Sequence, residues 1–117
     1  MRLEDLQTAD GHVESIETAR ESTIVVLRDW QEKLWQLKFV NAIALEAFSP
    51  EGEELAGVSV EAPEALARRA TEVTKDVDGP FQCYAFESAW SHHAVLRVVA
   101  SSCEVTTLEA TSPARRA

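Results

Sequence analysis

Residues 23–39 read TIVVLRDWQEKLWQLKF, and this stretch predicts two β-strands joined by a short turn. Its first part, residues 23–27, is a β-branched apolar run, which is typical of a strand buried on at least one face. The polar residues 31–33 supply the turn. Apolar and polar side chains then alternate, which is the period-two pattern of a half-buried strand. This alternation places three large apolar side chains on one face: Trp35, Leu37 and Phe39.

The alternation continues beyond this hairpin. Its odd parity is kept by three more apolar residues: Ile43, Leu45 and Ala47. Residues 34–48 are therefore predicted to form one long strand, in which Asn41 marks a bend or a bulge. A helix over residues 41–48 is the alternative, because alanine, leucine and glutamate favour helices. We prefer the strand, because the parity is unbroken.

Apolar runs and alternation predict strands in five further segments: residues 12–19, 55–61, 81–86, 94–100 and 103–108. In the first of them, strict alternation predicts that one face is shared by Val13, Ser15 and Glu17. Gly57 predicts an edge strand or a bulge in the second. Pro63 opens the one convincing helix, which is predicted near residues 63–76. Its apolar residues at helical spacing are Leu66, Ala70, Val73 and Val77.

About eight strands and one helix, joined by short connections, predict a mainly β fold of the α+β type. Sequential strands without intervening helices are antiparallel by default, so we expect an antiparallel sandwich or a curled sheet. A length of 117 residues fits one domain over residues 1–117. Within it, we expect residues 1–11 to be a loose lead-in that docks through Leu3 and Leu6, and residues 109–117 to be a disordered tail.

The net charge of −9 is unevenly distributed along the chain. Residues 1–66 hold 14 acids and 5 bases, whereas residues 67–117 hold 6 of each. This composition argues against nucleic-acid binding, which needs lysine and arginine to neutralise phosphates. Solubility alone explains an acidic surface most simply. The alternative is a face that meets a basic protein partner.

The chain is expected to be cytoplasmic and to have no membrane contact. Acids at Glu4 and Asp5, with no apolar run after them, argue against a secretory signal. The longest uncharged apolar stretch, residues 39–45, is far shorter than a membrane span.

No catalytic, cofactor-binding or metal-ligating residue is predicted, and the chain is more plausibly a binding protein than an enzyme. The three histidines, His12, His92 and His93, lack the spacing of a metal site. Cys103 is followed by Glu104, whose charge opposes an activated thiolate. With Cys83 it makes only two cysteines, which we expect to be small core residues rather than a disulfide scaffold.

Two of the three tryptophans are candidates for partner contact. Trp35 lies on the apolar parity and is predicted to belong to the core. Trp30 and Trp90 lie at strand ends beside polar residues, where an aromatic side chain either packs at the rim of the core or contacts a partner. The candidate contact residues in the predicted loops are Trp30, Trp90, His92, His93, Glu51, Glu53 and Glu54.

The order of apolar and polar residues over most of the chain resembles that of a known group of proteins. The resemblance rests on residues 10–16, 24–27, 37–42, 86–88 and 95–100. The group comprises small bacterial β-rich domains, mostly of unknown function, and some of its members are proposed immunity proteins of polymorphic toxin systems. The resemblance implies a protein-interaction module and no catalytic residues.

Three classes of function follow from these observations. The first is an interaction module that binds a basic partner, by analogy with immunity proteins. The second is a structural subunit that forms a homodimer through an edge strand or the face around Trp30. The third is a small enzyme or ligand carrier with a pocket between the sheets.

Overall fold

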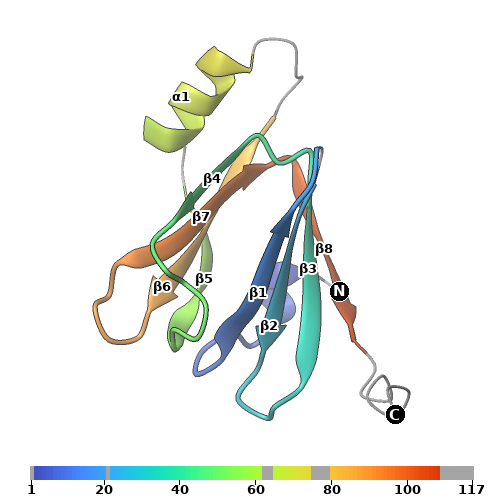
Figure 1. Cartoon of the computed structure of the whole chain (residues 1–117), viewed down its shortest axis with the longest axis vertical. Helices are drawn as coiled ribbons and strands as arrows, with labels where there is room; N and C mark the ends of the chain where they lie inside the picture. The colour runs from blue at the N-terminus through green and yellow to red at the C-terminus, as the bar shows by residue number, and fades with distance from the viewer. Residues whose placement is uncertain (1, 21, 62–64, 75–79, 109–117) are drawn as a thin grey trace.

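The structure is a computed structural model that describes residues 2–20, 22–61, 65–74 and 80–108. In these residues the chain forms two four-stranded antiparallel sheets that face each other, and one short α-helix (Figure 1). Sheet A has the order β1-β2-β3-β8, with bounds His12–Thr18, Ser22–Arg28, Leu34–Val40 and Ser102–Thr107. Sheet B has the order β4-β7-β6-β5, with bounds Ala44–Ala47, Ala94–Ala100, Gln82–Ser88 and Leu55–Glu61. The predicted mainly β fold is confirmed, and it is a sandwich.

The β2–β3 hairpin forms the centre of sheet A, as the sequence predicts. Its register is unbroken from Ser22 opposite Val40 to Arg28 opposite Leu34. The inward side chains of the pair are fully buried between the sheets: Val25, Leu27, Leu37 and Phe39. The ring of Phe39 packs against two aromatic rings of sheet B, with centroids 5.1 Å from Tyr84 and 6.1 Å from Phe86.

The prediction of one strand over residues 34–48 is wrong. β3 ends at Val40, Asn41 adopts a left-handed backbone with φ of 53°, and the chain crosses to sheet B, where β4 pairs with β7. Asparagine tolerates this conformation better than most residues, so the bend predicted at Asn41 becomes a corner between the sheets. The strand, and not the alternative helix, is confirmed for residues 44–47. Parity alone cannot distinguish one long strand from two strands in different sheets.

A β-bulge reverses the predicted alternation in β1. The register shifts between Val13 and Ser15, which leaves Glu14 as the extra residue. As a result, Val13 is fully buried and Ile16 also packs against the core, whereas Ser15 and Glu17 are exposed. The predicted shared face of Val13, Ser15 and Glu17 is therefore wrong.

Gly57 predicts either an edge strand or a bulge, and the structure has both. β5 is an edge strand of sheet B, and its register with β6 shifts between Leu55 and Gly57. The hydroxyl of Thr8 accepts a hydrogen bond from the Val58 backbone N–H at 3.0 Å, which satisfies one edge group of this strand.

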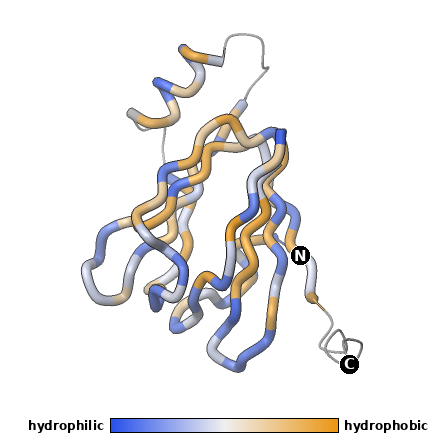
Figure 2. Tube along the Cα trace, in the orientation of Figure 1, coloured by the Kyte–Doolittle hydropathy of each residue, from blue (hydrophilic) through white to orange (hydrophobic). Residues whose placement is uncertain are grey.

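The N-terminal segment is held by more than its two leucines, because Thr8 is also buried and bonds β5. A short 3-10 helix, η1, spans Leu3–Asp5, and the side chains of Leu3 and Leu6 are buried in the core between the sheets. Figure 2 shows apolar residues concentrated along the strands and hydrophilic residues gathered in the hairpin turns at the lower end of the view. The predicted tail over residues 109–117 lies outside the described residues.

Helix α1 spans Ala65–Val73 and packs on the outer face of sheet B, near one end of it (Figure 1). Ala67 and Ala70 are buried there against Cys83 and Val99. Val73, predicted to share this face, is instead 77% exposed, because the apolar contact of the helix ends before its last turn. Residues 63, 64 and 75–77 of the predicted helix lie outside the described residues. No helix in the described chain is long and apolar enough to cross a membrane.

Candidate interaction surface

Four connecting segments meet at one end of the sandwich, the lower end in Figure 1. We call them together the loop end. They are residues 8–11 before β1, residues 29–33 between β2 and β3, residues 50–54 before β5, and residues 89–93 between β6 and β7. Each segment contains one residue with a left-handed backbone: Asp10, Glu32, Gly52 and His92. The loop end therefore consists of tight, sharply turned connections.

Backbone hydrogen bonds join three of these segments. Leu55 accepts from the N–H of Asp10 and donates to the carbonyl of Gly11, both at 2.8 Å. Gly52 donates to the carbonyl of Val13 at 2.8 Å, and Ala89 donates to the carbonyl of Glu54 at 2.9 Å. Residues 8–11, 50–54 and 89–93 therefore form one continuous surface.

Gly11 joins this surface to the fourth segment by close packing. A Cβ atom at this position would lie 2.7 Å from the Arg28 carbonyl oxygen and 3.2 Å from the Asp29 Cα. Both contacts are with backbone, which cannot move aside as a flexible side chain can. Only glycine therefore allows residues 8–11 to lie directly against the end of β2.

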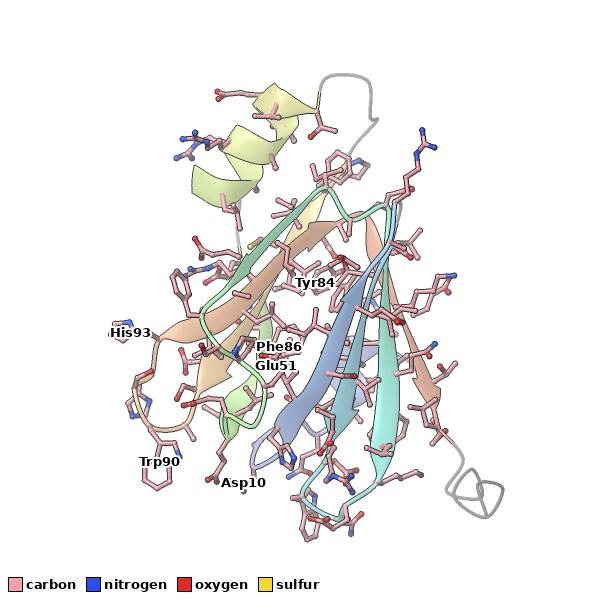
Figure 3. The ribbon with its side chains drawn as sticks, viewed as in Figure 1. Asp10, Glu51, Tyr84, Phe86, Trp90 and His93 are labelled. Atoms are coloured by element: carbon pink, nitrogen blue, oxygen red, sulfur yellow. The ribbon has the colours of Figure 1, made fainter. Side chains whose placement is uncertain are left out.

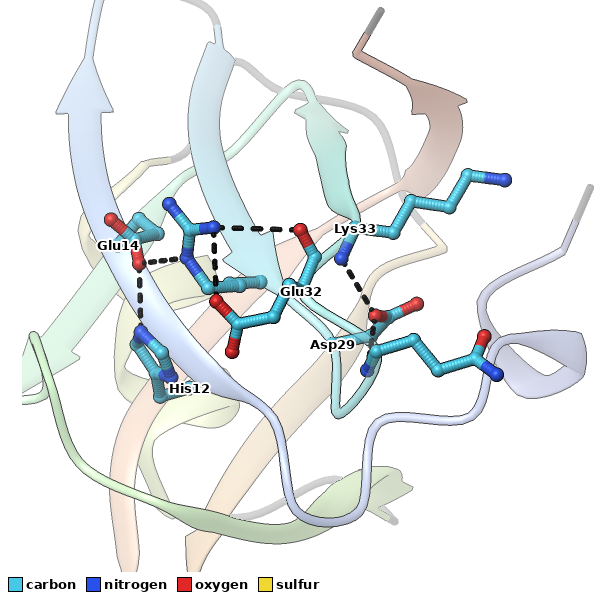
Figure 4. A network of polar contacts seen from close by, with 7 residues as sticks. His12, Glu14, Asp29, Glu32 and Lys33 are labelled. Carbon is cyan, nitrogen blue, oxygen red and sulfur yellow. Dashed lines mark hydrogen bonds and ion pairs between the residues drawn. The ribbon is translucent and has the colours of Figure 1, made fainter. Parts of the chain in front are cut away.

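The buried carboxylate of Asp29 organises the β2–β3 turn (Figure 4). Its Oδ1 accepts the backbone N–H groups of Gln31 and Lys33, and its Oδ2 accepts the Trp35 indole N–H, all at 2.9 Å. Burial alone raises the pKa of Asp29, but the hydrogen bonds from Trp35, Lys33 and Gln31 outweigh it and hold the pKa below the ordinary value. The turn that carries Trp30 is thus fixed from inside.

Ser88 has the same role in the β6–β7 turn. Its side chain is fully buried, and its hydroxyl oxygen accepts the backbone N–H groups of Trp90 and Ser91 at 3.1 and 3.2 Å. The hydroxyl donates to the carboxylate of Glu53. Glu53, a predicted contact residue, therefore holds two segments of the loop end together.

Three basic side chains at or beside the loop end have acidic or aromatic partners: His12, Arg28 and Lys33. Glu14 lies 2.7 Å from both Arg28 Nε and His12 Nε2, and Arg28 also approaches Glu32 at 3.5 Å (Figure 4). The hydrogen bonds from Arg28 and then His12 lower the pKa of Glu14. The ammonium of Lys33 lies 4.8 Å from the centre of the Trp35 ring.

Three carboxylates of the loop end have no such partner. Within the described chain, no ion pair is formed by Asp10, Glu51 or Glu54. Asp10 and Glu51 are exposed and Glu54 is half-buried. The loop end therefore presents negative charge that no ion pair within the described residues neutralises.

The tryptophans selected from the sequence lie at the tips of two of these turns. Trp30 is 54% exposed and Trp90 is 76% exposed, so a large part of each side chain faces solvent. Trp35 is half-buried against the core, as predicted. Figure 3 shows Trp90 and His93 projecting outward on the same turn, with Asp10 at the same end of the molecule.

All seven predicted contact residues belong to the loop end. Sequence reasoning missed Asp10, because its place there depends on the pairing of Leu55 with residues 8–11, which no local pattern reveals. The acidic residues of the first half do not form a single face. Glu46 and Glu61, for example, lie on the outer face of sheet B, where both bind Arg97.

The described residues contain no group of three or more histidine, cysteine or acidic side chains arranged to hold a metal ion. Burial, and then the charge of Glu104, raise the pKa of Cys103 to about 12, so its thiol stays protonated. Cys83 and Cys103 are both free. A pocket of about 430 Å³ lies at the seam between the sheets, lined in part by Arg2, Tyr84 and Cys103.

Comparison of the chain with protein-family models, with curated proteins and with solved structures found no match. The geometry of the loop end is therefore the main indication of function.

Proposed function

We propose that this protein is an interaction module that binds a basic protein partner through its loop end. The observation that carries the proposal is the exposure of Trp30 and Trp90 on turns that buried polar side chains hold in place. Tryptophan is enriched among the residues that dominate binding energy at interfaces. A rigid turn also limits the entropy lost when such a side chain is buried by a partner.

The charge of the loop end supports a basic partner. Asp10, Glu51 and Glu54 lie on the same surface as the tryptophans and form no ion pair within the described chain. Such carboxylates accelerate encounter with a positively charged protein. The tryptophan rings add faces on which arginine or lysine side chains stack. An immunity-like role, in which the loop end covers the basic active site of a toxin, fits this chemistry and the family resemblance.

The proposal predicts that W30A/W90A loses the partner while V73A keeps it. Removing two dominant aromatic contacts is expected to weaken binding by roughly 30-fold or more. Val73 is the control, because it is an apolar residue with 77% exposure that lies on α1, outside the loop end. The measurement is quantitative capture from host extract on immobilised wild type, W30A/W90A and V73A.

The expected result is a set of basic proteins retained by wild type and V73A but lost with W30A/W90A. Retention of the same proteins at the same level by all three forms would contradict the proposal. Because both tryptophans are largely exposed, we expect the variants to fold. Circular dichroism and thermal melting of each form test this expectation.

A further inference from the structure

The four edge strands of the sandwich differ in how their backbone is covered. β1 has a bulge at Glu14, and its Val13 carbonyl binds Gly52. β5 has a bulge and is bonded by Thr8. β4 is only four residues long. Bulges, short length and covering segments are the devices by which proteins keep edge strands from pairing with other chains.

β8 has no bulge and is longer than β4, and within the described residues η1 lies close to it without backbone hydrogen bonds to its edge. It is six residues long, and its pairing with β3 runs without a register shift from Ser102 to Thr107. In the described chain, no backbone hydrogen bond reaches its outer edge from another strand or loop. Its sequence, Ser-Cys-Glu-Val-Thr-Thr, is rich in β-forming residues and has a single charge, Glu104.

The ladder with β3 determines which backbone groups of β8 point outward. Leu108 donates its N–H to the Leu34 carbonyl, directly after the paired residues. In an antiparallel ladder this pattern repeats every two residues, so the even-numbered residues of β8 bind β3. The N–H and C=O groups left at the open edge belong to the odd-numbered residues: Cys103, Val105 and Thr107.

We infer that the open edge of β8 pairs with β8 of a second copy of this chain, antiparallel and centred on Val105. A two-fold axis through this residue pairs it with its own copy and pairs Cys103 with Thr107 of the other copy. All three are residues whose backbone groups point outward, so the new ladder uses the groups that are open. The two A sheets then become one continuous eight-stranded sheet.

The same register avoids a clash of like charges. It places Glu104 opposite Thr106 of the other copy on the outer face, and a register centred on Glu104 would instead place two glutamates opposite each other. The beginning of the β8 edge borders an open pocket that Ser102 and Cys103 line together with Arg2 and Leu3. The N-terminal segment therefore lies near β8 without forming a ladder with it.

Charge changes at Thr106 test this register. Thr106 is exposed, and its neighbour on β3 is the uncharged Gln36, so either charge is tolerated by the monomer. T106K places lysine opposite Glu104 of the other copy and is expected to tighten the dimer roughly fivefold, whereas T106E is expected to weaken it by a similar factor. T71K and T71E on α1 make the same changes in net charge away from β8.

The measurement is sedimentation equilibrium over roughly 0.01 to 1 mM protein, with hydrogen exchange at both ends of this range. The inference predicts a dimer whose stability follows T106K > wild type > T106E, with no such order for the Thr71 pair. It also predicts that amides of Cys103, Val105 and Thr107 become protected as concentration rises. A monomer throughout, including T106K, or equal effects of the Thr71 and Thr106 changes, would overturn it.

Discussion

Replacing Asp29 with alanine is expected to lower the free energy of unfolding by about 3 kcal/mol, because three hydrogen bonds to a buried carboxylate are lost. The N–H groups of Gln31, Lys33 and Trp35 lose their acceptor, and alanine offers no replacement. Chemical denaturation of wild type and D29A measures the difference. The turn that carries Trp30 is expected to loosen in the same variant.

D29N is the informative control for this prediction. Asparagine keeps one oxygen to accept the backbone N–H groups, but its amide nitrogen then faces the indole N–H of Trp35, where two donors meet. We expect the free energy of unfolding of D29N to lie between those of wild type and D29A. If D29A and wild type unfolded at the same denaturant concentration, the turn would not depend on this carboxylate.

The Asp29 carboxylate also makes the folded protein less stable at acidic pH. The pKa of Asp29 is lowered in the folded protein, so the unfolded chain binds the proton more tightly. Its contribution is therefore fully present above the unfolded pKa of about 4 and is lost as pH falls through the folded pKa. The difference in stability between wild type and D29N is expected to narrow in this acidic range.

Reversing two carboxylates of the loop end is expected to slow association with a basic partner by roughly 10- to 100-fold at low salt, because steering depends on the sign of the local charge. The variant is E51K/E54K. Both side chains lack ion pairs within the described chain, so the change removes no internal contact of that kind. Stopped-flow or surface-binding kinetics with the captured partner measure the association rate.

The control for net charge is E17K/E72K. It makes the same change in total charge at exposed positions on β1 and α1, outside the loop end. Only a small reduction in the association rate is expected for it, and added salt should reduce the difference between the two variants. Equal reductions would mean that total charge, and not the loop end, governs association.

Strands that carry their own local pattern could be predicted from the sequence. The β2–β3 hairpin forms as expected, because its buried run, polar turn and alternating partner all agree. The corner at Asn41 could not be predicted, because the chain leaves one sheet and enters the other without breaking the alternation. The bulge at Glu14 likewise depends on how β1 meets β2, which a single strand does not encode.

Only part of the candidate site could be predicted from the sequence. Trp30 and Trp90 stand out in the sequence because they lie beside polar turns. How far each side chain is exposed depends on how the neighbouring segments pack, which the sequence does not reveal. The support from Ser88 and Gly11 is tertiary, since each touches a segment distant in the sequence, whereas the contacts of Asp29 all lie within its own hairpin. The meeting of four loops at one end follows from strand order, which composition does not reveal.

The most direct test of the loop end as the binding surface is an NMR titration of isotope-labelled protein with a peptide rich in lysine and arginine. An acidic peptide of the same length is the control. The proposed function predicts shifts of the Trp30 and Trp90 indole N–H signals and of backbone amides in residues 50–54 and 89–93, with the basic peptide alone. Shifts confined to α1 or to the outer faces of the sheets would contradict it.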